Sequence, residues 1–146
     1  MNSIPGSDGR ESPQVDVALL LIRIAATLAF LFHGSGILFG IFGGPGPVQF
    51  AAFMRMPTVA GYLVGLAQVG GAIAVLSGIL TRVGAACLAV VMLGAIFLVH
   101  LPHGFDVTKG GIEYALTQLL IALALLFAGA GRYSLAGLLP PSLRKL

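Results

Sequence analysis

Long apolar stretches alternate with short polar breaks rich in glycine and proline along this chain. Four stretches, over residues 17–39, 58–79, 83–101 and 112–130, come close to the roughly 20 residues that a helix needs to cross a hydrocarbon core. Stretches this apolar must be helical, because a strand edge facing lipid leaves backbone N–H and C=O groups unpaired. The pattern predicts an all-α protein, an integral membrane bundle of four transmembrane helices.

The breaks between these stretches set the expected ends of the helices. The glycine- and proline-rich run 43–47 should end the first helix, and Pro102 should stop the third. In the first long loop, apolar side chains at 50, 53 and 54 fall at helical spacing, which predicts a short interfacial helix. After the fourth stretch, Ser134 is expected to cap another short helix.

These expectations divide the chain into three parts. Residues 1–16 are polar and predict a flexible N-terminal tail, residues 17–135 form the transmembrane domain, and residues 136–146 form a short C-terminal tail. The first apolar stretch is too long for the core of a secretory signal, so it is expected to be retained as a span.

Composition narrows the class of protein further. Hydrophobic residues make up 58% of the chain and charged residues 9%, with a mean hydropathy of +1.01, whereas soluble domains carry about 25% charged residues. This balance excludes a soluble domain and a disordered chain. The eight basic residues form no basic run, so the net charge of +3 does not indicate a nucleic-acid partner. A single cysteine, Cys87, excludes an internal disulfide.

The basic residues instead predict the orientation in the membrane. With four spans, both termini lie on one side, which would carry six basic residues, Arg10, Arg23, Arg82, Arg132, Arg144 and Lys145. The other side would carry only Arg55 and Lys109. We therefore expect a multi-pass protein of an inner (plasma) membrane with both termini in the cytoplasm. Arg23, inside the first span, is expected to extend its side chain to the cytoplasmic headgroups.

Two of the predicted helices carry a face of small residues, which lets helices approach closely in lipid. The first has Ala26, Ala29, His33, Gly36 and Gly40 at spacings of 3, 4, 3 and 4. The second has Gly61, Gly65, Gln68 and Ala72 at spacings of 4, 3 and 4. We expect both faces to point into the bundle, and they could face each other.

Polar side chains gather in the outer half of the predicted bundle, where each is a candidate site residue because burial in lipid is costly. The candidates are His33, Gln68, His100 and Glu113, with Tyr114, Thr117 and Gln118 beside Glu113 and with His103 and Asp106 in the adjoining loop. The inner half has little beyond Arg23, Thr27, Ser77 and Thr81.

Three interpretations of this cluster remain open. A quinone pocket would use histidine as a hydrogen-bond donor and proton carrier, with a carboxylate to orient it. Alternatively, the polar groups only bond to one another and fix the bundle. A metal or haem site built on His100, His103, His33 and Glu113 is disfavoured, because Pro102 breaks the helix between two of them and no cysteine–histidine motif is present.

A set of ordered short motifs resembles the DoxX family of small four-helix membrane proteins over residues 17–135. The motifs occupy residues 21–24, 32–34, 39–40, 43–46, 50–53, 80–82, 100–105, 110–114 and 131–134, reading LIRI, FHG, FG, GGPG, FAAF, LTR, HLPHGF, GGIEY and GRYS. Each is weak alone, and their order and spacing together are specific.

The resemblance implies a fold more firmly than a reaction. The family takes its name from a subunit of a thiosulfate:quinone oxidoreductase, which favours quinone over metal and an accessory subunit of a redox or oxidative-stress system. Such a subunit would sit in the lipid bilayer with protein partners or as a homo-oligomer. The alternative is a non-catalytic structural or assembly subunit.

Two departures from the family pattern bear on this reading. The family often has a lysine where this chain has Ile37, and a glutamate where it has Gln68. We hypothesise that the two positions face each other, because losing both charges together avoids leaving one buried charge unpaired. A catalytic step that needed this pair would be absent here.

Overall fold

The computed structural model of this chain describes residues 12–138, which are helical throughout apart from turns and loops. The α-helices are α1 (Pro13–Phe39), α2 (Gly46–Phe53), α3 (Thr58–Ser77), α4 (Thr81–Ala95) and α5 (Glu113–Ala128). A π-helical turn, Ile96–His100, continues α4, and short 3₁₀ segments follow at Leu101–His103, Val107–Lys109 and Leu135–Leu138.

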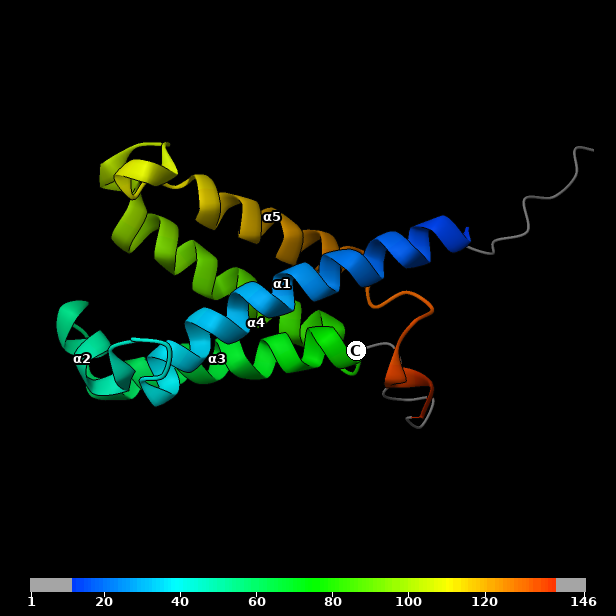
Figure 1. The fold of residues 1–146 in the computed structure, drawn as a ribbon, viewed down its shortest axis with the longest axis horizontal. Coiled ribbons are helices and arrows are strands. Elements are labelled where there is room, and N and C mark those ends of the chain that lie inside the picture. The colour runs from blue at the N-terminus through cyan, green and yellow to red at the C-terminus, as the bar shows by residue number, and fades with distance from the viewer. Residues whose placement is uncertain (1–11, 139–146) are drawn as a thin grey trace, which may run out of the picture.

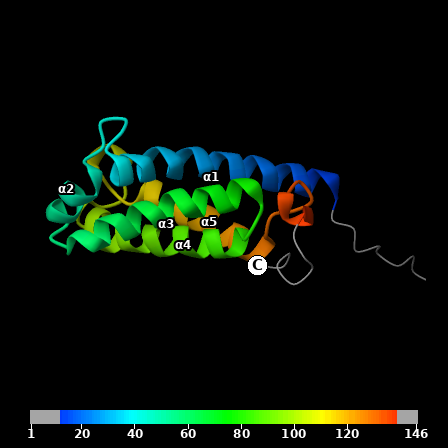
Figure 2. The ribbon, with the colours of Figure 1, turned by 90° about the horizontal axis from the view of Figure 1, so that it is seen from below.

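The four long helices lie lengthwise beside one another (Figures 1 and 2). Helix α1 packs mainly on α3, α3 on α4, and α4 on α5, whereas contact between α1 and α5 is sparse. Helix α2 and the loop before α5 lie at one end, called here the α2 end, and residues 12 and 138 lie toward the other, the terminal end. Toward the α2 end, α4 and α5 spread away from α1 and α3 (Figure 1).

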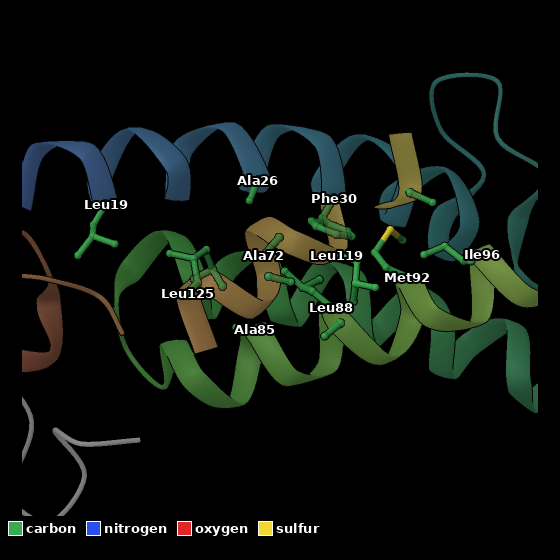
Figure 3. Close-up of a cluster of buried hydrophobic side chains, with 14 residues drawn as sticks. Leu19, Ala26, Phe30, Ala72, Ala85, Leu88, Met92, Ile96, Leu119 and Leu125 are labelled. Carbon is green, nitrogen blue, oxygen red and sulfur yellow. The ribbon is translucent and has the colours of Figure 1, made fainter. Parts of the chain in front are cut away.

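A buried apolar cluster runs along the centre of the bundle (Figure 3). Phe30 from α1, Val75 from α3, Leu88 from α4 and Leu125 from α5 are each at most 2% exposed. Large apolar side chains also cover much of the outside, including Leu28, Leu63, Val83 and Phe127, as expected of helices that lipid surrounds.

Three helical segments are long and apolar enough to cross a membrane: Pro13–Phe39, Thr58–Ser77 and Thr81–His103. Helix α5 is apolar but has only 16 residues. The all-helical class and the multi-pass membrane character that the sequence predicts are confirmed, and a crossing by α5 stays a prediction.

Helices α1 and α3 approach each other closely because glycine stands at their contact. A Cβ atom added to Gly34 of α1 would lie 2.7 Å from the Cβ of Gln68, and one added to Gly65 of α3 would lie 2.8 Å from the Cβ of Leu38. Thr27 of α1 also donates a hydrogen bond to the carbonyl of Ala72, 3.3 Å away. The small residues predicted on the second helix, Gly61 to Ala72, are all buried.

The face that α1 turns toward α3 differs from the predicted one. It carries Thr27, Gly34 and Leu38, which lie about 140° around the helix axis from the row through Ala29 and His33 at 3.6 residues per turn. Small residues occur on both faces, so residue size alone does not show which face packs. Two residues of the predicted row, Ala29 and His33, instead line a cavity, described below. Ala26 of that row is buried in the apolar core, as predicted for a face that points into the bundle.

Helix α1 starts earlier than the apolar pattern suggests. It begins at Pro13, a favoured residue for the first helical turn, so the predicted flexible tail 1–16 is too long at its C-terminal end. The carboxylate of Asp16 is buried and accepts a hydrogen bond from the backbone N–H of Arg132, at 2.8 Å. Residues 1–11 of that tail and residues 139–146 lie outside the described part.

The interpretation of Arg23 as a side chain that reaches the headgroups is wrong. Arg23 is 1% exposed, and its guanidinium donates to the carbonyl oxygens of Val75 and Ala130 at 2.7 and 2.8 Å. It also donates to the carbonyls of Leu76 and Tyr133. The segment after α5 folds back over α1, which the apolar pattern does not reveal, and so the side chain is enclosed.

Candidate functional site

A cavity of about 550 Å³ lies between the spreading halves of the bundle, near the α2 end. One wall comes from α1, α2 and α3, and the other from α4, its π-helical turn and α5. Most of the lining is apolar, with Phe30, Phe50, Phe53, Met54 and Met92 among its larger side chains. Ligand pockets commonly have volumes of about 300–1,000 Å³, apolar walls and a few polar groups.

Five polar side chains interrupt this apolar lining. They are His33 of α1, Gln68 of α3, His100 of the π-helical turn, and Tyr114 and Gln118 of α5. None of the residues that line the cavity is Asp, Glu, Lys or Arg. The site therefore offers hydrogen bonds without a carboxylate or a permanent cation, which suits a neutral and largely apolar molecule.

The predicted site residues separate into two groups. His33, Gln68 and His100 come from three different helical segments and line the same cavity. Glu113 does not line it, and its Oε2 accepts a hydrogen bond from the backbone N–H of Val107, 3.1 Å away. The carboxylate thus fastens the loop before α5 to the start of that helix.

The π-helical turn Ile96–His100 places His100 at the cavity. A π turn holds one more residue than an α turn, and such turns often occur at functional sites. The Nδ1 atom of His100 lies 2.6 Å from the carbonyl oxygen of Gly110. A carbonyl oxygen only accepts, so Nδ1 carries the proton, and Nε2 of the neutral ring is left as an acceptor.

His33 and Tyr114 meet across the two halves of the bundle. Their ring centroids are 5.9 Å apart with planes inclined by 58°, and the ring of Phe32 lies 5.3 Å from that of His33 in an edge-on arrangement. Aromatic pairs at such distances attract each other weakly. This contact adds to the sparse packing between α1 and α5.

Tyr114 and Gln118 are not among the site residues that the sequence predicts, although they follow Glu113 by one and five positions. Gln118 is 8% exposed, and its Oε1 atom is buried without a hydrogen-bond partner in the described part of the chain. The sequence does show Gln118 as a second amide at membrane depth, comparable to Gln68. It does not show the rotation of α5 about its axis, which turns residues 114, 115 and 118 toward the cavity.

The two positions that depart from the family pattern also border this cavity. Ile37 from α1 and Gln68 from α3 both line it. A lysine and a glutamate at these places would make the lining charged, so their absence is one reason why the cavity is neutral here.

The histidines do not assemble with other ligands. Between residues 12 and 138, no group of three His, Cys, Asp or Glu side chains is placed to hold a metal ion. His103 directs its Nδ1 to the carbonyl of Val99, at 3.0 Å, and does not line the cavity.

Comparison with known proteins agrees with this architecture. The model of the DoxX family matches residues 18–101. The chain is also 27% identical over 115 residues to a Bacillus subtilis (strain 168) protein named "Putative oxidoreductase CatD", covering 79% of this chain and 81% of that protein. No solved structure matches significantly. The family match spans more than half of the 146 residues, and the chain is therefore a member of the DoxX family.

Proposed function

We propose that this protein is an accessory subunit of a membrane redox system and binds a quinone in the cavity at the α2 end. The observation that carries the proposal is the convergence of His33, Gln68 and His100 on one mostly apolar cavity of about 550 Å³. The cavity lies within helices that lipid surrounds, where a lipid-soluble ligand is available.

The chemistry of the lining matches the two parts of a quinone. Apolar and aromatic side chains such as Phe30 and Phe50 can cover the ring and its tail. The carbonyl oxygens need donors, which the ring N–H of His33 and the amide of Gln68 can supply. The absence of charge from the lining avoids the desolvation penalty that a charged group would meet there.

An accessory role fits the small share of the chain that lies outside the helices. Most described residues lie in helices, so little surface remains for chemistry outside the membrane. The relative from Bacillus subtilis is named an oxidoreductase, which supports a place in redox chemistry for this chain as well. Electrons would come from a partner subunit or from a second copy of the protein.

The test is the affinity for a short-tailed benzoquinone, measured by equilibrium dialysis with the full chain in detergent. Replacing His33 or Gln68 removes one hydrogen bond, so His33→Ala and Gln68→Leu should each weaken binding by about fivefold or more. Ser35→Ala is the matched control, because Ser35 is a buried polar residue of α1 that bonds to the carbonyl of Phe32 and does not line the cavity.

Native mass spectrometry of the protein extracted from its own membranes separates this function from the alternative. A retained quinone that disappears in His33→Ala supports the proposal. A bound protein partner without a small molecule, together with unchanged quinone affinity in both variants, favours a structural or assembly subunit instead.

A further inference from the structure

Helices α3 and α4 touch closely near the turn that joins them and separate toward the α2 end. A Cβ atom added to Gly84 of α4 would lie 2.8 Å from the carbonyl oxygen of Gly71 of α3. About three turns further along α4, a Cβ atom added to Gly94 would have no neighbouring heavy atom within 4 Å among the described residues. Gly94 lines the cavity, so the separation of the two helices leaves the wall of the cavity open at this point.

Helix α2 is held on the other side of this opening. It packs on α3 and α1, and among residues 12–138 it hardly touches α4. A Cβ atom added to Gly61 of α3 would overlap the carbonyl group of Pro47 in α2, so these two helices are closely joined. The end of α4 lies apart from α2 (Figure 1), and the opening therefore follows from the way in which the helices pack.

The rim of the opening is apolar and exposed. Phe53 of α2, Val90 of α4 and Leu98 of the π-helical turn line the cavity and are 80%, 68% and 59% exposed. Side chains that border the cavity and are also exposed mark the place where the cavity meets its surroundings. Helices α2 and α4 supply only apolar residues and glycine to the lining, whereas its polar groups come from α1, α3, α5 and the π-helical turn.

The opening lies at the depth of the hydrocarbon core. Gly94 is near the middle of the apolar segment Thr81–His103, which is long enough to cross a membrane. Lipid chains would therefore surround the opening. An apolar part of a ligand can pass there at little cost, whereas a charged part would lose its hydration.

From this arrangement we infer that the cavity opens sideways into the lipid between α2 and α4 and takes a quinone with a long apolar tail, which leaves the cavity past Gly94. The inference rests on the proposed function, because His33 and Gln68 would hold the ring. A cavity of about 550 Å³ suits a drug-sized molecule, so a tail of many isoprene units must extend beyond it. Glycine at position 94 leaves the space that such a tail needs.

The first experiment compares two benzoquinones that carry either a methyl group or a decyl chain at the same ring position. Each is measured with the full chain and with Gly94→Leu by equilibrium dialysis at one detergent concentration. We expect Gly94→Leu to weaken binding of the decyl compound by about fivefold or more, because leucine occupies the space of the tail. Binding of the methyl compound should change by less than about twofold.

Gly70→Leu is the matched control for this experiment. Gly70 of α3 is also a helical glycine, and among the described residues nothing lies within 4 Å of an added Cβ atom, but Gly70 does not line the cavity. This variant should leave the affinity for both compounds unchanged.

The second experiment uses the unaltered protein, so it does not depend on the folding of a variant. A decyl benzoquinone with a photoreactive diazirine at the end of its tail is bound and irradiated, and the labelled peptides are identified by mass spectrometry. We expect labels near Phe53 of α2 and Leu98 of the π-helical turn, and excess unlabelled decyl compound should abolish them.

The results distinguish failure of this inference from failure of the proposed function. If neither compound binds the unaltered protein, the quinone site is overturned and the inference with it. If both bind, but Gly94→Leu causes no loss specific to the decyl compound, or Gly70→Leu causes the same loss, the inference is overturned and the quinone site stands. Labels near His33 and Tyr114 also overturn the inference, because the tail would then leave between α1 and α5.

Discussion

Arg23 donates hydrogen bonds both to the C-terminal end of α3 and to the segment that follows α5. The last carbonyl groups of a helix have no partner within it, and those of Val75 and Leu76 near the end of α3 receive the guanidinium of Arg23. The carbonyls of Ala130 and Tyr133 receive it as well. A cation near a helix C-terminus also interacts favourably with the helix dipole. One residue of α1 thus joins α3 to the segment after α5.

Replacing Arg23 should therefore destabilise the terminal end of the bundle. We expect Arg23→Met to lower the free energy of unfolding by roughly 3 kcal/mol or more, because several buried carbonyls lose charge-assisted hydrogen bonds. Arg23→Lys should recover only part, since an ammonium lacks the planar fork of a guanidinium. Thermal unfolding in detergent measures the effect. Arg132→Met is the control, as Arg132 is exposed at the same end, and a similar loss in both variants would contradict this role.

Asp106 gives a local response to pH in the loop before α5. Hydrogen bonds from the hydroxyl and the backbone N–H of Thr108, at 2.8 and 2.9 Å, hold the pKa of this carboxyl below its usual 3.8. Because the folded pKa is depressed, these bonds support the turn at pH values above 3.8, and the support is lost as the pH falls through the lowered pKa.

A carboxyl titration by nuclear magnetic resonance checks this expectation. The pKa of Asp106 should rise toward its usual value in Thr108→Val, which removes the hydroxyl donor. Lys109→Gln should change it less, because the Lys109 ammonium is 3.9 Å away and both side chains are well exposed. A larger change with Lys109→Gln would show that the ion pair, and not Thr108, sets the pKa.

The contact between α1 and α3 depends on glycine at position 34. A Cβ atom there would meet the Cβ of Gln68 at 2.7 Å and the backbone nitrogen of Val69 at 3.1 Å, so the two helices would have to separate. Gly34→Ala is expected to destabilise the protein by about 1–3 kcal/mol, the usual cost of overpacking.

Gly70→Ala is the matched control for that prediction. Gly70 is exposed on α3, and nothing lies within 4 Å of an added Cβ atom. Alanine favours a helix over glycine by about 0.8–1 kcal/mol, so this variant should be neutral or slightly stabilising in the same thermal unfolding experiment. Equal destabilisation by the two substitutions would show that close packing at Gly34 is not the cause.

The positions of the helices can be predicted because they depend on residues that are close together in the sequence. Long apolar runs bounded by glycine and proline indicated elements that agree with α1, α3, α4 and α5 within a few residues. The widening of α4 into a π turn before Pro102 was not predicted. It coincides with the bond of His100 to Gly110, a contact between segments that sequence periodicity does not relate.

The candidate site shows the same limit at the scale of the whole molecule. Depth in the membrane brought His33, Gln68 and His100 together in the prediction, because depth follows from position along a helix. The rotation of a helix about its axis does not follow from position along the chain. This rotation decides that Gln118 lines the cavity and that Glu113 does not. The prediction for the Arg23 side chain is wrong for a related reason, because the segment that encloses it, at Ala130, lies 107 residues away in sequence.

At the scale of the whole molecule, the number of membrane crossings and the orientation in the membrane can be predicted. At a rise of about 1.5 Å per residue, the 16 residues of α5 span roughly 24 Å, somewhat less than a hydrocarbon core of about 30 Å. The distribution of arginine and lysine favours four crossings with both termini in the cytoplasm. Thr108 before α5 and Leu138 after it, both exposed, would then lie on opposite sides of the membrane.

Single cysteines introduced into a Cys87→Ser background test this arrangement. A maleimide reagent that cannot cross membranes should label Thr108→Cys in intact cells, whereas Leu138→Cys should react only after the membrane is opened. Labelling of both positions from the same side would mean that α5 does not cross, and the fourth span would have to be abandoned. Labelling of Leu138→Cys alone in intact cells would instead keep four spans and reverse the orientation, and the cavity at the α2 end would then face the cytoplasm.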